Sequence, residues 1–209
     1  MRCSFKHKFI FIHVPKTAGS SIDTRLNGFN DLKSLYKHEG IPFVKNVTMS
    51  REYIQTIPAH ISSRELKAVL GQKYDNYFKF AFVRDPWDWK LSTYKYILKN
   101  RKHPAHETYK KFKSFHNYII ATPHRPRQQS DYIYSTDDKP LVDYVGRFEQ
   151  LQKDFTDICK IIGLHNNKLP HKNKTNHKHY TEYYNDETKQ IVTERYARDI
   201  ELFGYEFGK

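Results

Sequence analysis

The stretch Phe9-Ile-Phe-Ile-His-Val-Pro-Lys-Thr-Ala-Gly-Ser-Ser-Ile22 decides the fold. Its first part, Phe9–Val14, is rich in aromatic and β-branched residues and is typical of a buried strand. Pro15 ends the strand, small residues turn the chain, and residues 22–26 are expected to begin a helix. A strand followed by a tight turn and a helix start is typical of an anion-binding site, because backbone N–H groups face the turn.

The side chains of this turn strengthen the anion-site hypothesis. Lys16 adds a mobile positive charge. Hydroxyl groups follow at Thr17, Ser20 and Ser21. The P-loop of common kinases and ATPases has its lysine after the last glycine, whereas Lys16 precedes Gly19. We therefore predict a phosphate-binding turn that is not a Walker A loop; an ordinary turn with a surface lysine is the alternative.

Size and composition predict one globular domain over residues 1–209. Aromatic residues make up 15% of the chain, with 16 Tyr and 14 Phe, and these are expected to form much of the core. The formal net charge of +13 favours a polyanionic partner, although charges spread along the chain are also typical of a solvated surface.

The two cysteines and the length of the apolar segments indicate in which cellular compartment the protein is expected. Cys3 lies in what reads as a flexible N-terminus, and Cys159 lies in a helical pattern; neither has zinc-ligand spacing. Reduced thiols without a disulfide framework are expected. No apolar stretch has the length of a membrane span, so we expect a cytoplasmic protein.

Strand and helix patterns alternate along the rest of the chain. The expected elements are a helix from Ser62 or Ser63 to Gly71, a strand Tyr77–Val83, a helix from Pro86 to Asn100, a helix over 106–121, a polar loop over 123–140, a strand over 141–148, a helix over 149–162, a polar loop over 165–184 and a last helix from 185 to Gly204. This order predicts an α/β fold with a central, mostly parallel sheet flanked by helices.

A second informative stretch follows the Tyr77–Val83 strand. Arg84 comes directly after the strand, where open α/β sheets bind ligands. Asp85 and Pro86 are typical of an N-cap and a first helical residue. Ser92 lies about two helical turns further on. A phosphate could accept hydrogen bonds from both Arg84 and Ser92; a structural arginine and a solvent-facing serine are the alternative.

Together the two stretches resemble a specific family. Pro15-Lys-Thr-Ala-Gly-Ser-Ser21 is similar to the 5′-phosphosulfate loop of sulfotransferases that use 3′-phosphoadenosine 5′-phosphosulfate (PAPS). Arg84-Asp-Pro-Trp-Asp-Trp-Lys-Leu-Ser92 is similar to the 3′-phosphate motif of that family, although Trp89 stands where Arg or Lys is frequent. The nearest branch is the carbohydrate-type one, with heparan 2-O- and chondroitin sulfotransferases and small bacterial members. It implies a P-loop-like three-layer fold.

The resemblance implies roles for the matching positions. Lys16 would contact the bridging oxygen and the sulfuryl group. Backbone amides and hydroxyls of the turn would hold the 5′-phosphate; these residues are Thr17, Ala18, Gly19, Ser20 and Ser21. Arg84 and Ser92 would hold the 3′-phosphate. The product would be adenosine 3′,5′-bisphosphate (PAP), and no metal is expected. Trp87 and Trp89 are expected in the core rather than in the nucleotide site.

Sulfuryl transfer to a hydroxyl needs a base for the acceptor proton. Ala59-His60-Ile-Ser-Ser-Arg-Glu-Leu66 resembles the family segment whose histidine faces the acceptor, and a neutral imidazole suits proton transfer near pH 7. We therefore predict His60 as the base and as an acceptor contact. His13, at the end of the first strand, is expected to be a packed histidine and is the second candidate.

Further basic and polar side chains are candidates for binding. Lys172 and Lys174 are expected in a basic loop that closes over the nucleotide, as a C-terminal loop does in the family. Arg125, Arg127 and Gln129 are candidates for contacts with an anionic acceptor, with a solvated loop as the alternative. The irregular spacing of His165, His171, His177 and His179 does not favour a zinc site.

Two other functions remain open. The net charge fits a non-enzymatic protein that binds nucleic acid or acidic glycans, although no nucleic-acid motif is recognisable. A P-loop-like nucleotide kinase would require Mg²⁺ and ATP, and the lack of a Walker A pattern disfavours it. We expect a PAPS-dependent sulfotransferase that acts on a hydroxyl group. Resemblance to the carbohydrate-type branch implies that this hydroxyl belongs to a carbohydrate.

Overall fold

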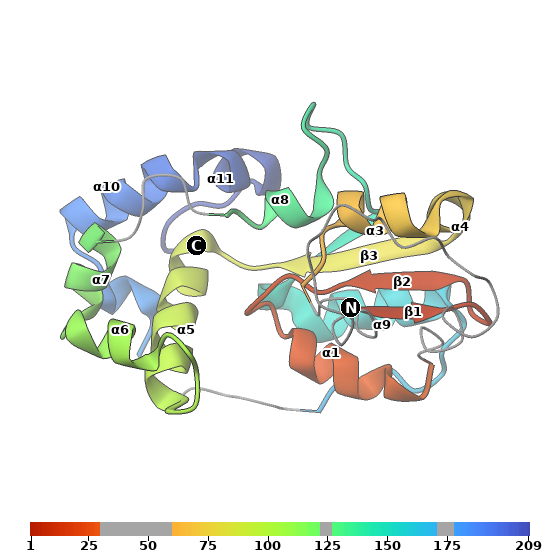
Figure 1. Ribbon diagram of the computed structural model, residues 1–209, viewed down its shortest axis with the longest axis horizontal. Helices are drawn as coiled ribbons and strands as arrows, with labels where there is room; N and C mark the ends of the chain where they lie inside the picture. Colours follow the sequence, from red (N-terminus) through yellow and green to blue (C-terminus); the bar gives the residue numbers. More distant parts are fainter. Residues whose placement is uncertain (30–59, 122–126, 171–177) are drawn as a thin grey trace, which may run out of the picture. The chain divides into compact units, whose positions relative to one another are not determined.

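A computed structural model describes residues 1–29, 60–121, 127–170 and 178–209 (Figure 1). The chain divides into two compact units. The first unit comprises Met1–Val83 and Asp131–Lys172, and the second comprises Arg84–Ser130 and Asn173–Lys209. The single domain expected over residues 1–209 stays a prediction.

A four-stranded sheet forms the centre of the first unit. Its order is β1 (Arg2–Ser4), β2 (Phe9–Ile12), β3 (Phe78–Val83) and β4 (Tyr144–Arg147). The β2–β3 and β3–β4 pairs are parallel, which confirms the mostly parallel sheet, and β1 is antiparallel to β2. Because Ile12 pairs with Ala81, β2 and β3 end at the same edge of the sheet.

The structure corrects two expectations about the N-terminal segment. Residues 2–4 form strand β1, and Cys3 within it is completely buried, so this end of the chain is not the flexible terminus we expected. A three-residue strand carries too little periodicity to be recognised from sequence. Strand β2 also ends at Ile12, two residues before Val14.

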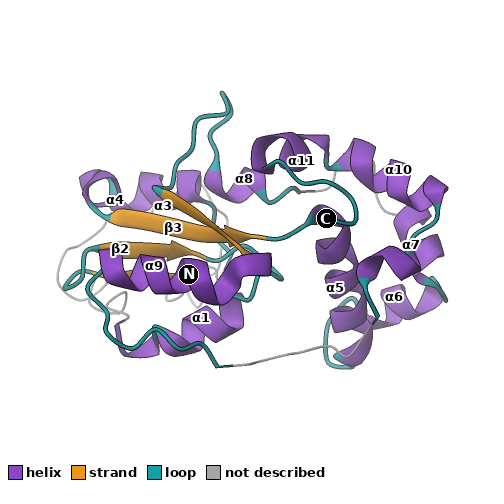
Figure 2. Ribbon diagram, turned by 180° about the vertical axis from the view of Figure 1, so that it is seen from behind, coloured by secondary structure: helices purple, strands orange, loops and turns teal. Residues whose placement is uncertain are grey.

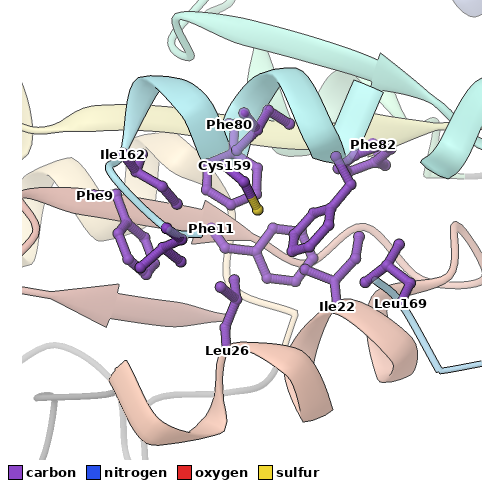
Figure 3. Packing of buried hydrophobic residues seen from close by; sticks show 12 residues of the cluster. Phe9, Phe11, Ile22, Leu26, Phe80, Phe82, Cys159, Ile162 and Leu169 are labelled. Carbon is purple, nitrogen blue, oxygen red and sulfur yellow. The ribbon is translucent and has the colours of Figure 1, made fainter. Parts of the chain in front are cut away.

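Helices cover both faces of this sheet. The elements are α1 (Gly19–Arg25), η1 (Asn27–Phe29), α3 (Ser63–Leu70), α4 (Gln72–Asn76), η3 (Phe148–Gln150) and α9 (Leu151–Ile161). Figure 3 shows side chains from α1 and α9 gathered around Phe11, Phe80 and Phe82 on one face. Helices α3 and α4 lie on the other side (Figures 1 and 2). The predicted α/β sheet flanked by helices is therefore confirmed.

In the described part of the second unit, the regular elements are helices (Figure 2). They are α5 (Pro86–Lys99), α6 (His106–Lys111), α7 (Phe115–Ala121), η4 (Tyr180–Tyr183), α10 (Asp186–Arg195) and α11 (Ala197–Phe203); α8 (Ser130–Ile133) spans a sequence boundary between the units. The helix predicted over 106–121 is two helices, because Lys113 has a φ of 61°. The last predicted helix is likewise interrupted, at Tyr196.

Aromatic rings form much of the core of the second unit, as the composition predicted. The ring of Tyr94 lies 5.2 Å from that of Tyr118 and 5.6 Å from that of Phe115, measured between centroids. Trp87 and Trp89 are only 2% and 7% exposed, which confirms their predicted core role.

Lys90 of α5 is buried within this aromatic core. Its ammonium group lies 4.9 Å from the ring centroid of Tyr118 and 5.5 Å from that of Tyr196. Burial, with a smaller contribution from the positive charge of Arg195, lowers the pKa of Lys90 from 10.5 to about 7. Cation–π attraction offsets only part of the cost of removing this charge from water.

We expect Lys90→Met to raise the free energy of unfolding by about 1–3 kcal/mol near pH 7, because it removes a buried charge. Between pH 7 and 10.5 the unfolded wild type binds more protons than the folded one, so its stability rises with pH. The stability advantage of methionine over lysine is therefore greatest at or below pH 7 and shrinks toward pH 10.5.

Urea unfolding at pH 6.5 and 9 measures this difference in the free energy of unfolding, and the exposed Lys99→Met on the same helix is the control. A destabilised Lys90→Met protein at both pH values would contradict it.

Candidate anion-binding site

The turn after β2 has an unusual backbone. Lys16 and Ala18 both have a φ of 65°, in the left-handed region that residues with a side chain rarely adopt. Turns that contain left-handed residues are where successive backbone N–H groups form concave anion-binding nests. This turn is therefore the candidate anion-binding site, and its role in binding phosphate stays a prediction.

The side chains of the turn differ in exposure and in role. Thr17 is completely buried, and its hydroxyl donates a 2.9 Å hydrogen bond to the carbonyl oxygen of Val14. That hydroxyl therefore holds the turn together. Ser20 is exposed, whereas Ser21 is 5% exposed. Lys16 is half-buried, at the first of the two left-handed positions.

Helix α1 begins inside the predicted turn, at Gly19 rather than at Ile22. Its N-cap is Ala18, which provides no side-chain hydrogen bond, and the N–H groups of Ser21 and Ile22 donate to the Ala18 carbonyl. Ser20 and Ser21 therefore lie in the first turn of the helix.

His13 and His60, the two candidate bases, are in contact with each other beside this turn. The ring centroids of His13 and His60 are 4.5 Å apart, and His60 Nδ1 lies 2.9 Å from the backbone oxygen of His13. A carbonyl oxygen only accepts, so Nδ1 of His60 carries the proton and Nε2 of the neutral ring is the acceptor. His60 is exposed.

His13 is packed rather than exposed. Its ring stacks on Phe11 with centroids 5.7 Å apart, and burial, with a smaller contribution from His60, lowers its pKa from 6.5 to about 3. A methyl group added to Gly19 would lie 1.8 Å from Nε2 of His13. Only glycine at position 19 therefore leaves room for this imidazole.

We expect Gly19→Ala to displace His13 or the turn and to lower the free energy of unfolding by about 1–3 kcal/mol. A Gly28→Ala variant is the matched control, because nothing lies within 4 Å of its added methyl group. Thermal unfolding of both proteins measures the difference. A Gly19→Ala variant as stable as Gly28→Ala would contradict the contact with His13.

Arg84 and Ser92, the second predicted pair, are in direct contact. Nη1 of Arg84 donates a 3.0 Å hydrogen bond to the Ser92 hydroxyl. Both Nε and Nη2 of Arg84 lie 2.7 Å from one carboxylate oxygen of Asp88. Arg84 and Ser92 are 7% and 5% exposed. The contact with Asp88 was not predicted from the sequence, because Arg84 precedes the N-cap of α5 and so lies outside the helical i, i+4 pattern.

Asp85 begins helix α5 next to this pair, as predicted. Its carboxylate accepts hydrogen bonds from the N–H groups of Trp87 and Asp88 and, at 2.8 Å, from the Tyr180 hydroxyl. Burial raises the pKa of Asp85 from 3.8 to about 6, against these hydrogen bonds. The helix that carries Ser92 is therefore held at its first turn.

Gln129 lies elsewhere than its predicted place on an acceptor-binding surface. It is completely buried, and its side-chain amide pairs with the backbone of Arg84 through two hydrogen bonds. Of the other predicted binding residues, Arg127 is exposed, whereas Arg125, Lys172 and Lys174 lie outside the described residues.

The described residues were searched for a metal-binding cluster and for a membrane-spanning helix. Within the described ranges, no group of three or more His, Cys, Asp or Glu side chains is placed to hold a metal ion. His171 and His177 of the predicted histidine group lie outside those ranges. None of the helices described is both long and apolar enough to cross a membrane.

Comparison with known proteins identifies the family of this chain. A family model described as the sulfotransferase family matches residues 1–206. Among solved structures, the chain is similar to mouse sulfotransferase SULT7A1 complexed with PAP, with 14% identity, a TM-score of 0.45 and coverage of 97% of this chain and 85% of that one. No curated protein matches. The family model, rather than this distant structural likeness, carries the assignment.

Proposed function

The chain belongs to the sulfotransferase family, and from this premise we propose that it transfers a sulfuryl group from PAPS to a hydroxyl of an acceptor. The observation that supports this proposal most directly is the turn at Lys16–Ser21, where Lys16 and Ala18 are left-handed and fit an anion nest after the parallel strand β2. In the reaction, the bond between sulfur and the 5′-phosphate oxygen breaks, and a bond from sulfur to the acceptor oxygen forms.

The turn takes the 5′-phosphosulfate end of the donor in this proposal. Backbone N–H groups of Thr17, Ala18 and Gly19, with the Ser20 and Ser21 side chains, hold the 5′-phosphate. The ammonium group of Lys16 stabilises the negative charge that grows on the phosphate as it leaves, and this charge stabilisation is the main catalytic contribution.

Arg84 and Ser92 take the 3′-phosphate in this proposal. The guanidinium group offers five N–H donors in a planar fork that matches phosphate oxygens, and Ser92 adds a hydroxyl. Their mutual hydrogen bond supports the assignment, because it holds both donors in one place before a phosphate arrives.

His60 takes the proton of the acceptor hydroxyl in this proposal. Its Nδ1–H is held by the His13 carbonyl, so that Nε2 is the basic atom. His13 is a poorer candidate, because a pKa of about 3 makes its ring a weak base at neutral pH. The His13 backbone nevertheless orients His60.

We expect His60→Ala to lower kcat by about 10²–10⁴-fold, the usual contribution of general-base catalysis, with little change in PAPS affinity. Added imidazole is expected to restore part of the activity. His165→Ala, which removes another exposed histidine of the same unit, is the control and is expected to behave as wild type. A His60→Ala enzyme with wild-type kcat would exclude His60 as the base.

The acceptor is proposed to be a carbohydrate hydroxyl, as in the branch that the chain resembles. Arg127 is exposed and fits a contact with an acidic or already sulfated glycan. Arg125, Lys172 and Lys174 are proposed as further contacts on sequence grounds alone. Transfer of labelled sulfate from PAPS to a panel of neutral glycans, acidic glycans and small alcohols tests this part.

Calorimetric titration with PAP and with adenosine 5′-monophosphate (AMP) tests the proposal as a whole. AMP lacks the 3′-phosphate that Arg84 and Ser92 are proposed to hold. We expect PAP to bind more tightly by about tenfold or more, the worth of a charge-assisted hydrogen bond. Failure of the wild-type protein to bind PAP would refute the proposed donor, and salt-sensitive binding of heparin without PAP binding would favour a polyanion-binding protein.

A further inference from the structure

We infer that Gln129 and Asp199 are positioning residues that fix Arg84 for recognition of the 3′-phosphate. This inference rests on the proposed function. The three residues belong to the same unit, although 45 residues separate Arg84 from Gln129 and 70 separate Gln129 from Asp199.

Gln129 fixes the backbone of Arg84 on both sides of its Cα atom. The Arg84 N–H donates to Oε1 of Gln129 at 2.9 Å, and Nε2 of Gln129 donates to the Arg84 carbonyl at 2.7 Å. Arg84 is the single residue between strand β3 and the N-cap of α5, so it belongs to neither element's own ladder of hydrogen bonds. Gln129 supplies the partners that a strand neighbour would otherwise provide.

Asp199 in turn fixes Gln129. Its two carboxylate oxygens accept 2.8 Å hydrogen bonds from the N–H groups of Gln129 and Ser130. The Asp199 N–H donates at 3.2 Å to the side chain of Gln128. Asp199 and Gln129 are both completely buried, where such charge-assisted bonds are strong and their loss is costly.

These backbone contacts also affect the direction of the Arg84 guanidinium group. Its direction depends on the backbone orientation of Arg84 as well as on its contacts with Asp88 and Ser92. A small rotation of this backbone moves the end of a long side chain by more than the tolerance of a bidentate hydrogen bond. Loss of Gln129 or Asp199 is therefore expected to weaken 3′-phosphate recognition more than binding of the rest of the nucleotide.

The test compares PAP with AMP in three variants. Gln129→Met keeps the side-chain length and removes both bonds to Arg84, whereas Asp199→Asn is milder and acts one step away. Asp154→Asn is the matched control, because Asp154 is a buried carboxylate of the other unit that accepts from the Arg147 N–H. Thermal unfolding first establishes that each variant is folded.

We expect the ratio of the dissociation constants for AMP and PAP to fall about tenfold in Gln129→Met, with a smaller fall in Asp199→Asn and AMP affinity nearly unchanged. Asp154→Asn is expected to lose stability and to keep the wild-type ratio. Folded Gln129→Met and Asp199→Asn proteins that keep the ratio, or that lose PAP and AMP affinity equally, would overturn the inference. The wild-type titration is read separately: equal affinity for PAP and AMP there would refute the proposed function itself.

Discussion

Replacement of Lys16 by methionine is expected to lower kcat by about 10²–10³-fold, the usual effect of removing one group that stabilises developing charge in the transition state. Methionine keeps an unbranched apolar stem of similar length and removes only the ammonium group. Since the charge on the leaving phosphate grows during transfer, the loss should appear mainly in kcat and less in the affinity for PAPS.

Lys8→Met is the matched control for this change. Lys8 is an exposed lysine of the same unit with a φ of 50°, so the same substitution is made at a second lysine with a positive φ. Initial rates of sulfate transfer and calorimetric binding of PAP separate kcat from affinity. Equal rates for Lys16→Met and Lys8→Met would remove Lys16 from the mechanism.

A Lys16→Gly variant separates charge from backbone conformation. A residue with a side chain in the left-handed region costs about 1 kcal/mol, and glycine at that position relieves this cost. The glycine variant should therefore be at least as stable as the Lys16→Met protein and equally slow. Loss of activity in both variants, without loss of stability in the glycine variant, would show that the charge of Lys16 and not its backbone conformation is needed.

Local signals in the sequence predicted much of the fold. Ser62 caps α3 with the reciprocal Ser62–Glu65 bonds, Asp85 caps α5, and Gly204 follows α11 with a φ of 61°. Each of these depends on residues within a few positions of one another. The apolar runs at β2 and β3 likewise predicted two neighbouring parallel strands, because short buried runs between helices have few alternatives.

The contacts that fix the candidate site were less accessible to sequence reasoning. Gln129 was expected to face an acceptor because it lies in a polar loop near Arg125 and Arg127, yet it is completely buried against the Arg84 backbone. Nothing within its own segment signals a partner 45 residues earlier or Asp199 70 residues later. Polar residues that pair with distant backbone have no period, so only the folded structure identifies them.

Arg84→Lys is expected to abolish most of the preference for PAP over AMP, with a fall of about 10–100-fold in the ratio of their dissociation constants. Lysine keeps the positive charge but loses the planar fork, so it cannot contact Asp88, Ser92 and a phosphate together as arginine does. Binding of AMP, which lacks the 3′-phosphate, should change little.

Arg195→Lys is the matched control, because Arg195 is a half-buried arginine of the same unit whose guanidinium group contacts the carbonyl oxygens of Ile119 and Ile120. It is expected to keep the wild-type ratio. Ser92→Ala should lower the ratio less than Arg84→Lys, since it removes one neutral hydroxyl and leaves the guanidinium group paired with Asp88. If Arg84→Lys kept the full preference for PAP while Arg195→Lys lost it, the 3′-phosphate would be recognised by the other arginine, and the assignment of the Arg84–Ser92 pair would be wrong.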